Sequence, residues 1–503
     1  MAMVRKEFER VTPESVGIRS KDIMELLDEC ESGFTELHGL QIMRYGKICA
    51  EGWWQPYAPG IVHGLQSLTK TYAATAVGIA VTEGLVRLED RIIDIFAEEA
   101  PKEPGENLKL LTVRDVLCMG CGMDVMSPPS KDWIRDFLAT PVNHRPGTTF
   151  MYNSTGSTLL GAIVRKLTGI GLHDYLKPRL FDKIGVDAAR LKWFLMTDGM
   201  EVGGGGLFAT TEDNLRLMKL YADGGVCNGE RILSEDYVKK ATSLQNDSAT
   251  EVNGNPNATD NFLGYGFQIW KCKPEGVYRA DGAMGQFAIV VPHKEMILSI
   301  NETAGEAHWA QKTLDAIWSF LEKVGDAPLA ENTAESGRLK KRLSVASLPA
   351  PRFAPYSPEV LRINGVCFSV TQGEFGFESN IEKMMAGNPV PNTITAFTFH
   401  FGVNSCKMEY TQNGERLTAL IALDGTRQHN RVQIKSTPCT ELYLHGEWVS
   451  RQTFRVTSRW VETCFEKQFD FTFMPDEVLI AVNCSVGRFG PMGANTTAAR
   501  AKS

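Results

Sequence analysis

The chain has 503 residues, of which 43% are hydrophobic and 22% charged, a balance typical of a soluble globular protein with roughly two or three domains. Its net charge of −7 at pH 7 gives no support for binding to nucleic acid or to an anionic membrane surface. The sequence shows no signal peptide and no apolar run of about 18 residues, so we expect a cytoplasmic chain without a membrane span.

The first elements expected along the chain are a helix and a pair of strands. Residues 20–31 place apolar side chains at helical spacing, which predicts an amphipathic helix. Residues 40–45 and 47–50 have the pattern of two short strands that turn at Gly46. The chain is therefore expected to begin its fold with a helix followed by a β-hairpin.

The most informative stretch follows, around Ser67 and Lys70. Residues 71–81 (TYAATAVGIAV) are small or apolar, and no charged residue occurs before Glu83. Such a run predicts a helix that is buried on all sides and packs closely against its neighbours. Ser67 then lies at the start of this helix, with Lys70 one turn later on the same face. Because burial of an ammonium favours its neutral form, Lys70 could act as the base that activates Ser67.

This Ser-x-x-Lys pattern has two interpretations. A helix N-terminus offers a backbone N–H to a developing oxyanion, and that geometry suits a serine nucleophile. The bare pattern is weak, however, since a chain of this length should contain roughly one or two copies by chance. Ser67 could equally be an ordinary helix-start residue with Lys70 in solvent.

A Cys-x-x-Cys pair at Cys118 and Cys121 has the spacing of a redox or zinc site. The sequence places no second cysteine pair and no histidine pair to complete such a site, and Gly122 follows directly. We interpret the pair as small residues in a tight turn. No metal ion and no organic cofactor is expected, and the eleven cysteines are expected to be reduced thiols.

Helices and strands alternate less regularly beyond the buried helix. Helical patterns occur at three places: 112–117, 132–138 and 157–167. Residues 203–206 predict a flexible turn before a helix capped by Thr211. Residues 264–301 return to strand patterns, and 308–323 predict a final amphipathic helix.

Two loops in this region carry further candidate groups. Tyr152 precedes an apolar helix, and a tyrosine beside an ammonium is a plausible base, because the cation stabilises the phenolate. Residues 282–286 (GAMGQ) open an apolar strand and could bring a backbone N–H to an oxyanion. Each also has a plain structural interpretation: a core aromatic for Tyr152, a hairpin turn for residues 282–286.

The order of these elements predicts an α+β fold for residues 1–325, with one antiparallel sheet closed by the two ends of the region and flanked by helices. Residues 326–352 are rich in Ala, Glu, Lys, Arg, Ser and Pro, which favours a linker. Residues 353–490 show short alternating strands typical of a separate all-β sandwich or barrel domain. Residues 491–503 are expected to be a disordered tail.

Several motifs occur together in a fixed order: Glu51-Gly-Trp-Trp54, Ser67-Leu-Thr-Lys70, Thr112-Val-Arg-Asp-Val-Leu117, Tyr152-x-x-x-Gly-x-x-Leu-Leu-Gly161, Gly206-Leu-Phe-Ala-Thr-Thr-x-Asp213 and Ala280-x-Gly282-x-x-Gly-Gln286. With these motifs in register, the chain resembles the serine β-lactamase and penicillin-binding protein superfamily. Within it, the chain is similar to the branch of class C β-lactamase-like esterases, D-aminopeptidases and 6-aminohexanoate-dimer hydrolases. The resemblance covers about residues 10–325.

The resemblance implies a role for each candidate group. Ser67 would be the nucleophile, with Lys70 and Tyr152 as the general base and acid pair. The backbone N–H groups of Ser67 and Ala283 would form the oxyanion hole. The implied fold is the β-lactamase/transpeptidase-like α+β fold.

The chain departs from the family pattern after its tyrosine. The family's Tyr-x-Asn is here Tyr152-Asn153-Ser154. The amide that usually touches the substrate is thus replaced by a hydroxyl or displaced to Asn153. Asn153 and Ser154 are therefore both candidate substrate contacts.

A second departure concerns the family's Lys-Thr-Gly or His-x-Gly, which is here Ala280-Asp281-Gly282. The cation that would hold a β-lactam carboxylate is missing, and Asp281 would repel that carboxylate. Asp281 is either a turn residue, with Arg279 as its candidate ion-pair partner, or a pocket residue that favours substrates carrying an amine. Asp281 and Gly282 join the candidate substrate contacts, and true β-lactamase activity is not expected.

The sequence thus predicts a serine hydrolase that cleaves an amide or ester bond in a small molecule or short peptide through an acyl-enzyme. No nucleic-acid or membrane partner is expected. The alternative is a non-catalytic binding protein that kept the fold and lost turnover. The presence of Ser67, Lys70 and Tyr152 together favours the enzyme.

Overall fold

The computed structural model of the chain describes residues 7–33, 35–127, 130–251, 254–305, 307–377, 393–434, 437–486 and 496–503. The chain divides into two compact units, of which the first ends at Ser347 and the second begins at Leu348. This division falls inside the segment 326–352 that the sequence predicts as a linker. In the described parts of the chain, no helix is both long and apolar enough to cross a bilayer.

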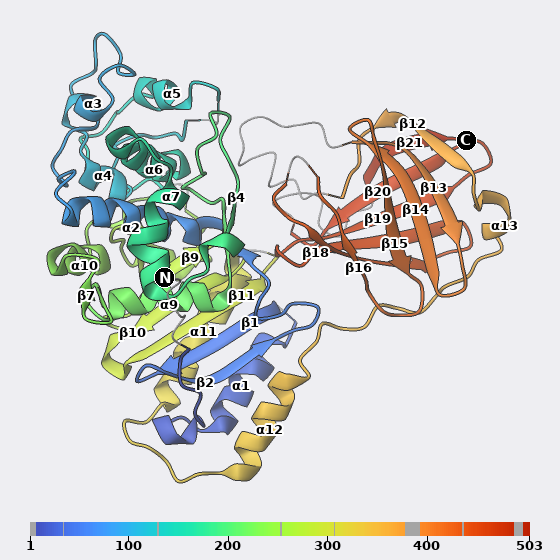
Figure 1. Cartoon of the computed structure of the whole chain (residues 1–503), viewed down its shortest axis with the longest axis horizontal. Coiled ribbons are helices and arrows are strands. Elements are labelled where there is room, and N and C mark those ends of the chain that lie inside the picture. The colour runs from blue at the N-terminus through green and yellow to red at the C-terminus, as the bar shows by residue number, and fades with distance from the viewer. Residues whose placement is uncertain are drawn as a thin grey trace. The chain divides into compact units, whose positions relative to one another are not determined.

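The first unit is built around an antiparallel sheet (Figure 1), in which six described strands follow the order β2-β1-β11-β10-β9-β8. These strands are β1 (Glu36–Arg44), β2 (Lys47–Trp53), β8 (Trp270–Lys271), β9 (Tyr278–Gly282), β10 (Gln286–Val291) and β11 (Met296–Thr303). β1 pairs with β11 from Glu36 opposite Thr303 to Arg44 opposite Met296. The predicted antiparallel sheet, in which strands from the two ends of the region meet, is confirmed.

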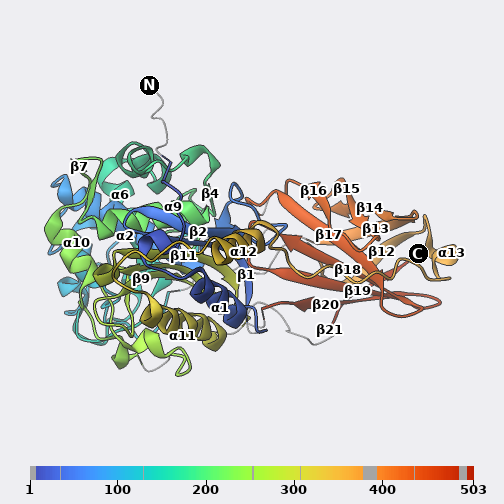
Figure 2. The ribbon, with the colours of Figure 1, turned by 90° about the horizontal axis from the view of Figure 1, so that it is seen from below.

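Helices cover both faces of this sheet (Figure 2). The helices of these layers are α9 (Thr211–Ala222) on one face and α1 (Ser20–Cys30), α11 (Ala307–Lys323) and α12 (Thr333–Ser344) on the other. Glycines in the strands allow the close approach: a Cβ on Gly39 would lie 2.7 Å from Thr211 Oγ1, and a Cβ on Gly52 would lie 2.7 Å from a methyl carbon of Leu343. The core of the unit therefore lies on both sides of the sheet.

Helix α12 corrects the predicted linker. Residues 333–344 form a helix whose first turn is capped by Asn332, which accepts a hydrogen bond from the N–H of Glu335 (3.1 Å). Leu339 and Leu343 are buried, and Arg342 donates to Oε2 of Glu31 (2.8 Å), the residue that follows α1. The segment is polar overall, so its narrow apolar face is hard to recognise without the surface against which it packs.

The remaining elements of the first unit lie between β2 and β8 in sequence. They are helices α2 (Thr69–Thr82), α3 (Ile92–Ile95), α4 (Val113–Leu117), α5 (Trp133–Ala139), α6 (Ser154–Thr168), α7 (Leu172–Leu176), α8 (Asp182–Ile184) and α10 (Glu235–Thr242), and short strands β3 (His63–Gly64), β4 (Lys192–Trp193), β5 (Leu207–Ala209), β6 (Val226–Cys227) and β7 (Glu230–Arg231). Short strands β3, β5 and β4 form a small sheet in that order.

Helix α2 is buried from Thr69 to Ala80, as its run of small residues predicts. Its packing against α10 needs Gly78, because a Cβ at that position would overlap the ring of Tyr237. The Tyr237 hydroxyl donates to the carbonyl of Ala74 (2.6 Å). Small side chains thus let aromatic neighbours reach the helix backbone and exclude water from it.

In the second unit, nine described strands close into a β-barrel. They are β12 (Cys367–Gly373), β13 (Ile394–Phe401), β14 (Ser405–Gln412), β15 (Glu415–Ala422), β17 (Glu441–Trp448), β18 (Thr453–Trp460), β19 (Glu466–Phe473), β20 (Val478–Cys484) and β21 (Thr496–Lys502). The ring closes where Ala422 of β15 lies beside His445 of β17, and β16 (Gln428–Arg431) adds to β17. The unit also contains α13 (Val360–Ile363). The predicted all-β domain is confirmed and is a barrel.

Phenylalanine rings pack inside this barrel, with Phe471 of β19 at 5.2 Å from Phe397 and 5.1 Å from Phe399 between ring centroids. The prediction of a disordered tail over 491–503 is wrong for residues 496–502, which form β21 between β12 and β20. Among the side chains of this strand that the structure describes, 498–502, the buried ones are the small Ala499 and Ala501. Its place in the sheet therefore depends on its two neighbours more than on its own apolar pattern.

Candidate active site

Ser67 lies in a 3₁₀ turn, Gln66–Leu68, that leads directly into α2. Gln66 has a φ of 50°, a left-handed conformation that costs a non-glycine residue about 1–2 kcal/mol. This turn follows β3, which pairs with β5 through Gly64 opposite Phe208. The partly exposed Ser67 is thus presented on a strained backbone held by the small β3-β5-β4 sheet.

Lys70 is buried, with 1% of its surface exposed, and lies in the first turn of α2. Its Nζ donates a hydrogen bond to Ser67 Oγ (2.8 Å) and another to the carbonyl of Gly204. The structure therefore removes the interpretation in which Lys70 extends into solvent. The ammonium or amine of Lys70 directly contacts the hydroxyl of Ser67.

Tyr152 completes a group of three side chains. Lys70 Nζ lies 4.9 Å from the centroid of its ring, and the ring stacks on Trp270 at 5.7 Å with an interplanar angle of 14°. The backbone N–H of Tyr152 donates to Glu251 Oε1 (3.0 Å). Segments far apart in the sequence therefore hold Tyr152 beside Lys70 and Ser67.

The loop before α9 is packed against α6 and is not the free turn that its glycines suggest. A Cβ on Gly204 would overlap the carbonyl of Ser154, and the Gly204 N–H donates to Thr158 Oγ1 (3.0 Å). This contact places the Gly204 carbonyl against Lys70. The following helix is capped by Thr210 in a capping box with Asp213, one residue before the predicted cap.

Asn153, a candidate substrate contact from the sequence, is the cap of helix α6. Its side chain is fully buried, and its Oδ1 accepts the N–H of Gly156 (2.8 Å) as the N-cap of α6. An asparagine before a helix commonly caps it in this way, and that signal competes with any substrate role. Ser154, the first residue of α6, is partly exposed and stays a candidate contact.

The turn that joins β9 to β10 approaches the loop before Ser67. Gly282 ends β9, and a Cβ there would overlap the carbonyl of Leu65, two residues before Ser67. Only glycine allows these two backbones to lie so close. Ala283, which follows and is partly exposed, therefore lies near the 3₁₀ turn of Ser67.

Asp281 is paired with Arg279 on the same strand. Arg279 Nε donates to Asp281 Oδ2 (2.7 Å), and the side chains are 1% and 19% exposed, respectively. Arg279 also donates to Asn261 Oδ1 (2.6 Å) and to the carbonyl of Lys271 (3.0 Å). Burial raises the pKa of Asp281, and Arg279 and Lys70 act in the opposite direction. The pair presents little net charge to the pocket.

Comparison with known proteins agrees with this geometry. The family model described as Beta-lactamase matches residues 27–312, which is more than half of the chain. The chain belongs to the β-lactamase family. The 6-aminohexanoate-dimer hydrolase of Paenarthrobacter ureafaciens is 25% identical to this β-lactamase-family chain over 246 residues, or 45% of the chain. The match spans 61% of the length of that relative.

Two solved structures show the same fold as this β-lactamase-family chain. A Bacteroides dorei DSM 17855 protein provisionally named a β-lactamase aligns with a TM-score of 0.50 at 15% identity, covering 61% of this chain and 98% of its own. A Bacillus anthracis protein provisionally named a 6-aminohexanoate-dimer hydrolase aligns with a TM-score of 0.50 at 17% identity, covering 68% and 89%. The predicted β-lactamase/transpeptidase-like fold is confirmed.

Glu302, at the end of β11, is a fully buried carboxyl beside the β9–β10 turn. A Cβ on Gly285 would overlap this carboxyl, and Thr313 Oγ1 donates to both of its oxygens (2.9 and 3.1 Å). Burial raises the pKa of Glu302 from 4.5 to about 8, although hydrogen bonds from Thr313 and Thr35 act in the opposite direction. No motif in the sequence marks this carboxyl as part of the site.

Glu302 should lower the free energy of unfolding as the pH rises from about 4.5 to about 8. In this window the carboxyl is ionised in the unfolded chain and protonated in the folded one, so the folded state binds more protons and raising the pH favours unfolding. We expect the free energy of unfolding of Glu302→Gln to rise relative to that of the wild type by up to about 1.4 kcal/mol for each pH unit in this window. Urea denaturation at pH 5, 6, 7 and 8 measures this, and a constant difference between the two proteins would contradict it.

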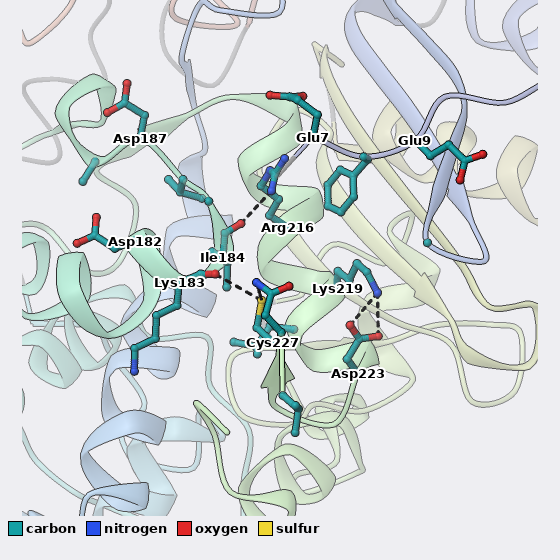
Figure 3. A pocket seen from close by; sticks show the side chains of 18 of the residues that line it. Glu7, Glu9, Asp182, Lys183, Ile184, Asp187, Arg216, Lys219, Asp223 and Cys227 are labelled. Carbon is teal, nitrogen blue, oxygen red and sulfur yellow. Dashed lines mark hydrogen bonds and ion pairs between the residues drawn. The ribbon is translucent and has the colours of Figure 1, made fainter. Parts of the chain in front are cut away.

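A separate cavity of about 1200 Å³ lies elsewhere in the first unit (Figure 3), between the N-terminal segment, α8, α9 and β6. Ser67, Lys70 and Tyr152 do not line it. Its charged side chains have partners of their own: Arg216 donates to the carbonyl of Ile184 (3.0 Å), and Lys219 pairs with Asp223 (2.7 Å). These contacts stabilise the wall of the cavity and indicate no reactive group.

Several neighbours of the candidate site were not found from the sequence. Trp270, which stacks on Tyr152, lies in the short strand β8, and Glu251, which accepts a hydrogen bond from the backbone N–H of Tyr152, lies in a loop. Neither residue belongs to a recognisable motif. The sequence motif from Gly206 to Asp213 begins two residues after Gly204. No part of that motif indicated that the carbonyl of Gly204 would face Lys70. Among the described residues, no group of three or more His, Cys, Asp or Glu side chains is arranged to hold a metal ion.

Proposed function

We propose that this chain is a serine hydrolase that cleaves an ester or amide bond of a small molecule or short peptide through an acyl-enzyme on Ser67. The observation that carries the proposal is the 2.8 Å contact between Lys70 Nζ and Ser67 Oγ. A serine hydroxyl is a weak nucleophile until a neighbouring base accepts its proton. The buried Lys70 is in hydrogen-bond reach of that proton.

In the first step, Ser67 Oγ attacks the carbonyl carbon of the substrate, and its proton passes to Lys70 or Tyr152. A neutral amine at Lys70 retains two N–H donors and one lone pair. One N–H can remain on the carbonyl of Gly204 while the lone pair accepts the proton of Ser67. Collapse of the tetrahedral adduct transfers the proton to the departing alcohol or amine and leaves the acyl group on Ser67.

In the second step, a water molecule attacks the acyl carbon and gives a proton to the same pair, Lys70 and Tyr152. The ester bond to Ser67 breaks, Oγ recovers a proton, and a carboxylic acid is released. The backbone N–H groups of Ser67 and Ala283 are proposed to stabilise the oxyanion in both steps, as donors fixed before the reaction begins. The approach of Gly282 to Leu65 supports this pairing of donors.

The chemistry of the substrate is limited by the pair Arg279–Asp281. A β-lactam carboxylate needs a cation at the edge of the pocket, and the family's cationic position before Gly282 is here Asp281, which pairs with Arg279. A neutral ester or amide suits this environment better. The relative named 6-aminohexanoate-dimer hydrolase supports amide substrates as one option.

We expect Asp281→Asn to reduce kcat/KM for an aminoacyl anilide and for a neutral p-nitrophenyl ester by similar factors. The change removes the carboxylate to which the buried Arg279 donates, and the loss of one partner of a buried ion pair costs about 3–5 kcal/mol of stability. Urea denaturation and the two rate measurements test this together. A loss of about 5- to 150-fold confined to the aminoacyl substrate would show instead that Asp281 binds a substrate amine.

A fluorophosphonate probe tests the proposed function directly. We expect covalent labelling of the wild-type chain at Ser67, located by mass spectrometry, and none in Ser67→Ala. A panel of p-nitrophenyl esters, D-aminoacyl amides and a chromogenic cephalosporin then identifies the substrate class. A folded chain that is neither labelled nor active on the panel would favour the alternative, a binding protein without turnover.

A further inference from the structure

The turn between β9 and β10 has an unusual backbone. Met284 and Gly285 have φ values of 64° and 87°, so two successive residues are left-handed. Met284 is not a glycine, and this conformation costs it about 1–2 kcal/mol. A strained turn keeps its shape only if surrounding groups hold it.

The side chain of Gln286 makes several of the contacts that hold this turn. Gln286 is fully buried at the start of β10, and its Nε2 donates to the carbonyl of Glu302 (2.7 Å). The same Nε2 lies 3.3 Å from the carbonyl of Met284 and 3.5 Å from that of Ala283. One amide thus links the two carbonyls of the turn to the neighbouring strand β11.

The orientation of this amide is itself determined by its neighbours. Gln286 Oε1 accepts a hydrogen bond from Asn301 Nδ2 (3.0 Å). Asn301 Oδ1 in turn accepts from Thr211 Oγ1 (2.8 Å) at the start of α9. Because the amide oxygen is used by Asn301, only the NH₂ group can face the turn. A buried chain of hydrogen bonds therefore connects α9 to the turn.

We infer that Gln286 is a positioning residue that sets the direction of the Ala283 N–H toward the oxyanion, and this inference rests on the proposed function. Peptide units are rigid planes, and the carbonyls of Ala283 and Met284 belong to the two planes that follow Ala283. Holding these planes fixes the C-terminal side of Ala283 and so limits the movement of the residue that carries the N–H. A donor of an oxyanion hole stabilises the transition state only when it is oriented in advance. Gln286 touches neither substrate nor reacting atoms and acts through the backbone.

Gln286→Met tests this inference, because methionine fills a similar volume and donates no hydrogen bond. With the best ester substrate of the panel, we expect kcat to fall about 100-fold, as for a displaced or lost oxyanion donor, while KM stays within about threefold. The affinity for an aryl boronic acid, whose tetrahedral adduct on Ser67 places an oxygen at the same position, should fall by a similar factor.

Gln41→Met is the matched control. Gln41 is an equally buried glutamine of the same sheet, and its Nε2 donates to Glu51 Oε2 (3.0 Å) away from the turn. We expect its kcat and boronic acid affinity to stay within about twofold of the wild type. If Gln286→Met behaves like Gln41→Met, or if the boronic acid affinity is unchanged, the inference is overturned.

Gln286→Glu keeps the test decisive if the methionine variant does not fold. A protonated glutamic acid retains one donor for the turn, whereas its carboxylate would face the carbonyls of Glu302 and Met284 with no donor. The ionisable groups beside the turn are Glu302 and the pair Asp281–Arg279, which both proteins share. Each rate of the variant is therefore divided by the wild-type rate at the same pH. We expect this ratio to be near one at pH 5.5 and to fall at least tenfold as the new carboxyl ionises.

The inference is overturned if the ratio of the Gln286→Glu rate to the wild-type rate stays constant with pH while circular dichroism shows that the variant is folded. The failure of the proposed function is a different result. In that case the wild-type chain itself would show neither fluorophosphonate labelling nor ester turnover, and both proposals would fall together. Wild-type turnover that depends on Ser67 but not on Gln286 would remove the positioning role alone.

Discussion

Replacing Ser67 by alanine is expected to lower the rate of hydrolysis by about three or more orders of magnitude and to leave the fold intact. The variant loses the Oγ that receives the hydrogen bond from Lys70 and would carry the acyl group. Alanine fits the 3₁₀ turn, because Ser67 has an ordinary place in it and the strained residue is Gln66. The measurements are kcat/KM with the best substrate and the unfolding midpoint in urea.

Ser20→Ala is the matched control for this prediction. Ser20 is a fully buried serine at the start of α1, and its Oγ donates to Glu14 Oε2 (3.1 Å). Removing this hydroxyl should lower the free energy of unfolding and leave kcat/KM within about twofold of the wild-type value. If Ser67→Ala retains near-normal turnover, Ser67 is not the nucleophile, even if the fluorophosphonate probe labels it in the wild-type chain.

The second large effect is expected from Lys70 and Tyr152, because we propose that they transfer protons as one unit. Lys70→Ala and Tyr152→Phe should each reduce kcat by about two or more orders of magnitude, since a positioned acid–base group contributes roughly 10²–10⁴-fold. The double variant should be little worse than the poorer single one, as for residues that act together. The 4.9 Å between Lys70 Nζ and the Tyr152 ring is the basis for this expectation.

A double-mutant cycle on kcat measures this coupling. Lys271→Met serves as a control, since Lys271 is a half-buried lysine of the same unit whose Nζ donates to the carbonyl of Thr242 (2.8 Å). That change should leave the coupling between Lys70 and Tyr152 unaltered. Losses that multiply in the double variant would indicate independent roles and a wrong pairing.

The sequence indicated the parts of the site that depend on local pattern. The run of small residues over 71–81 predicted a helix buried on all sides, and the structure confirms that helix. The spacing of Ser67 and Lys70 placed them on one face of that helix. The motifs around Tyr152 and Gly282, taken in order, supplied the family resemblance and hence the fold.

Other features could not be predicted because they arise between segments distant in sequence. The carbonyl of Gly204 reaches Lys70 only because that loop packs on α6. Asn153, a candidate substrate contact from the sequence, also caps the helix that follows it, because its Oδ1 accepts the N–H of Gly156. Helix α12 and strand β21 were missed for a related reason, since both are weakly apolar and are ordered by the surfaces beside them.

By itself, the sequence determined the α+β class, the all-β second domain and the identity of Ser67, Lys70 and Tyr152 as candidates, because these depend on periodicity and short spacings. Only the tertiary structure decided the contact between Lys70 and Ser67, the pairing of Asp281 with Arg279, the closed barrel, and the amide of Gln286 under the β9–β10 turn. The reason is that hydrogen bonds and buried ion pairs are made by atoms that packing brings within about 3 Å, and sequence separation does not report that distance.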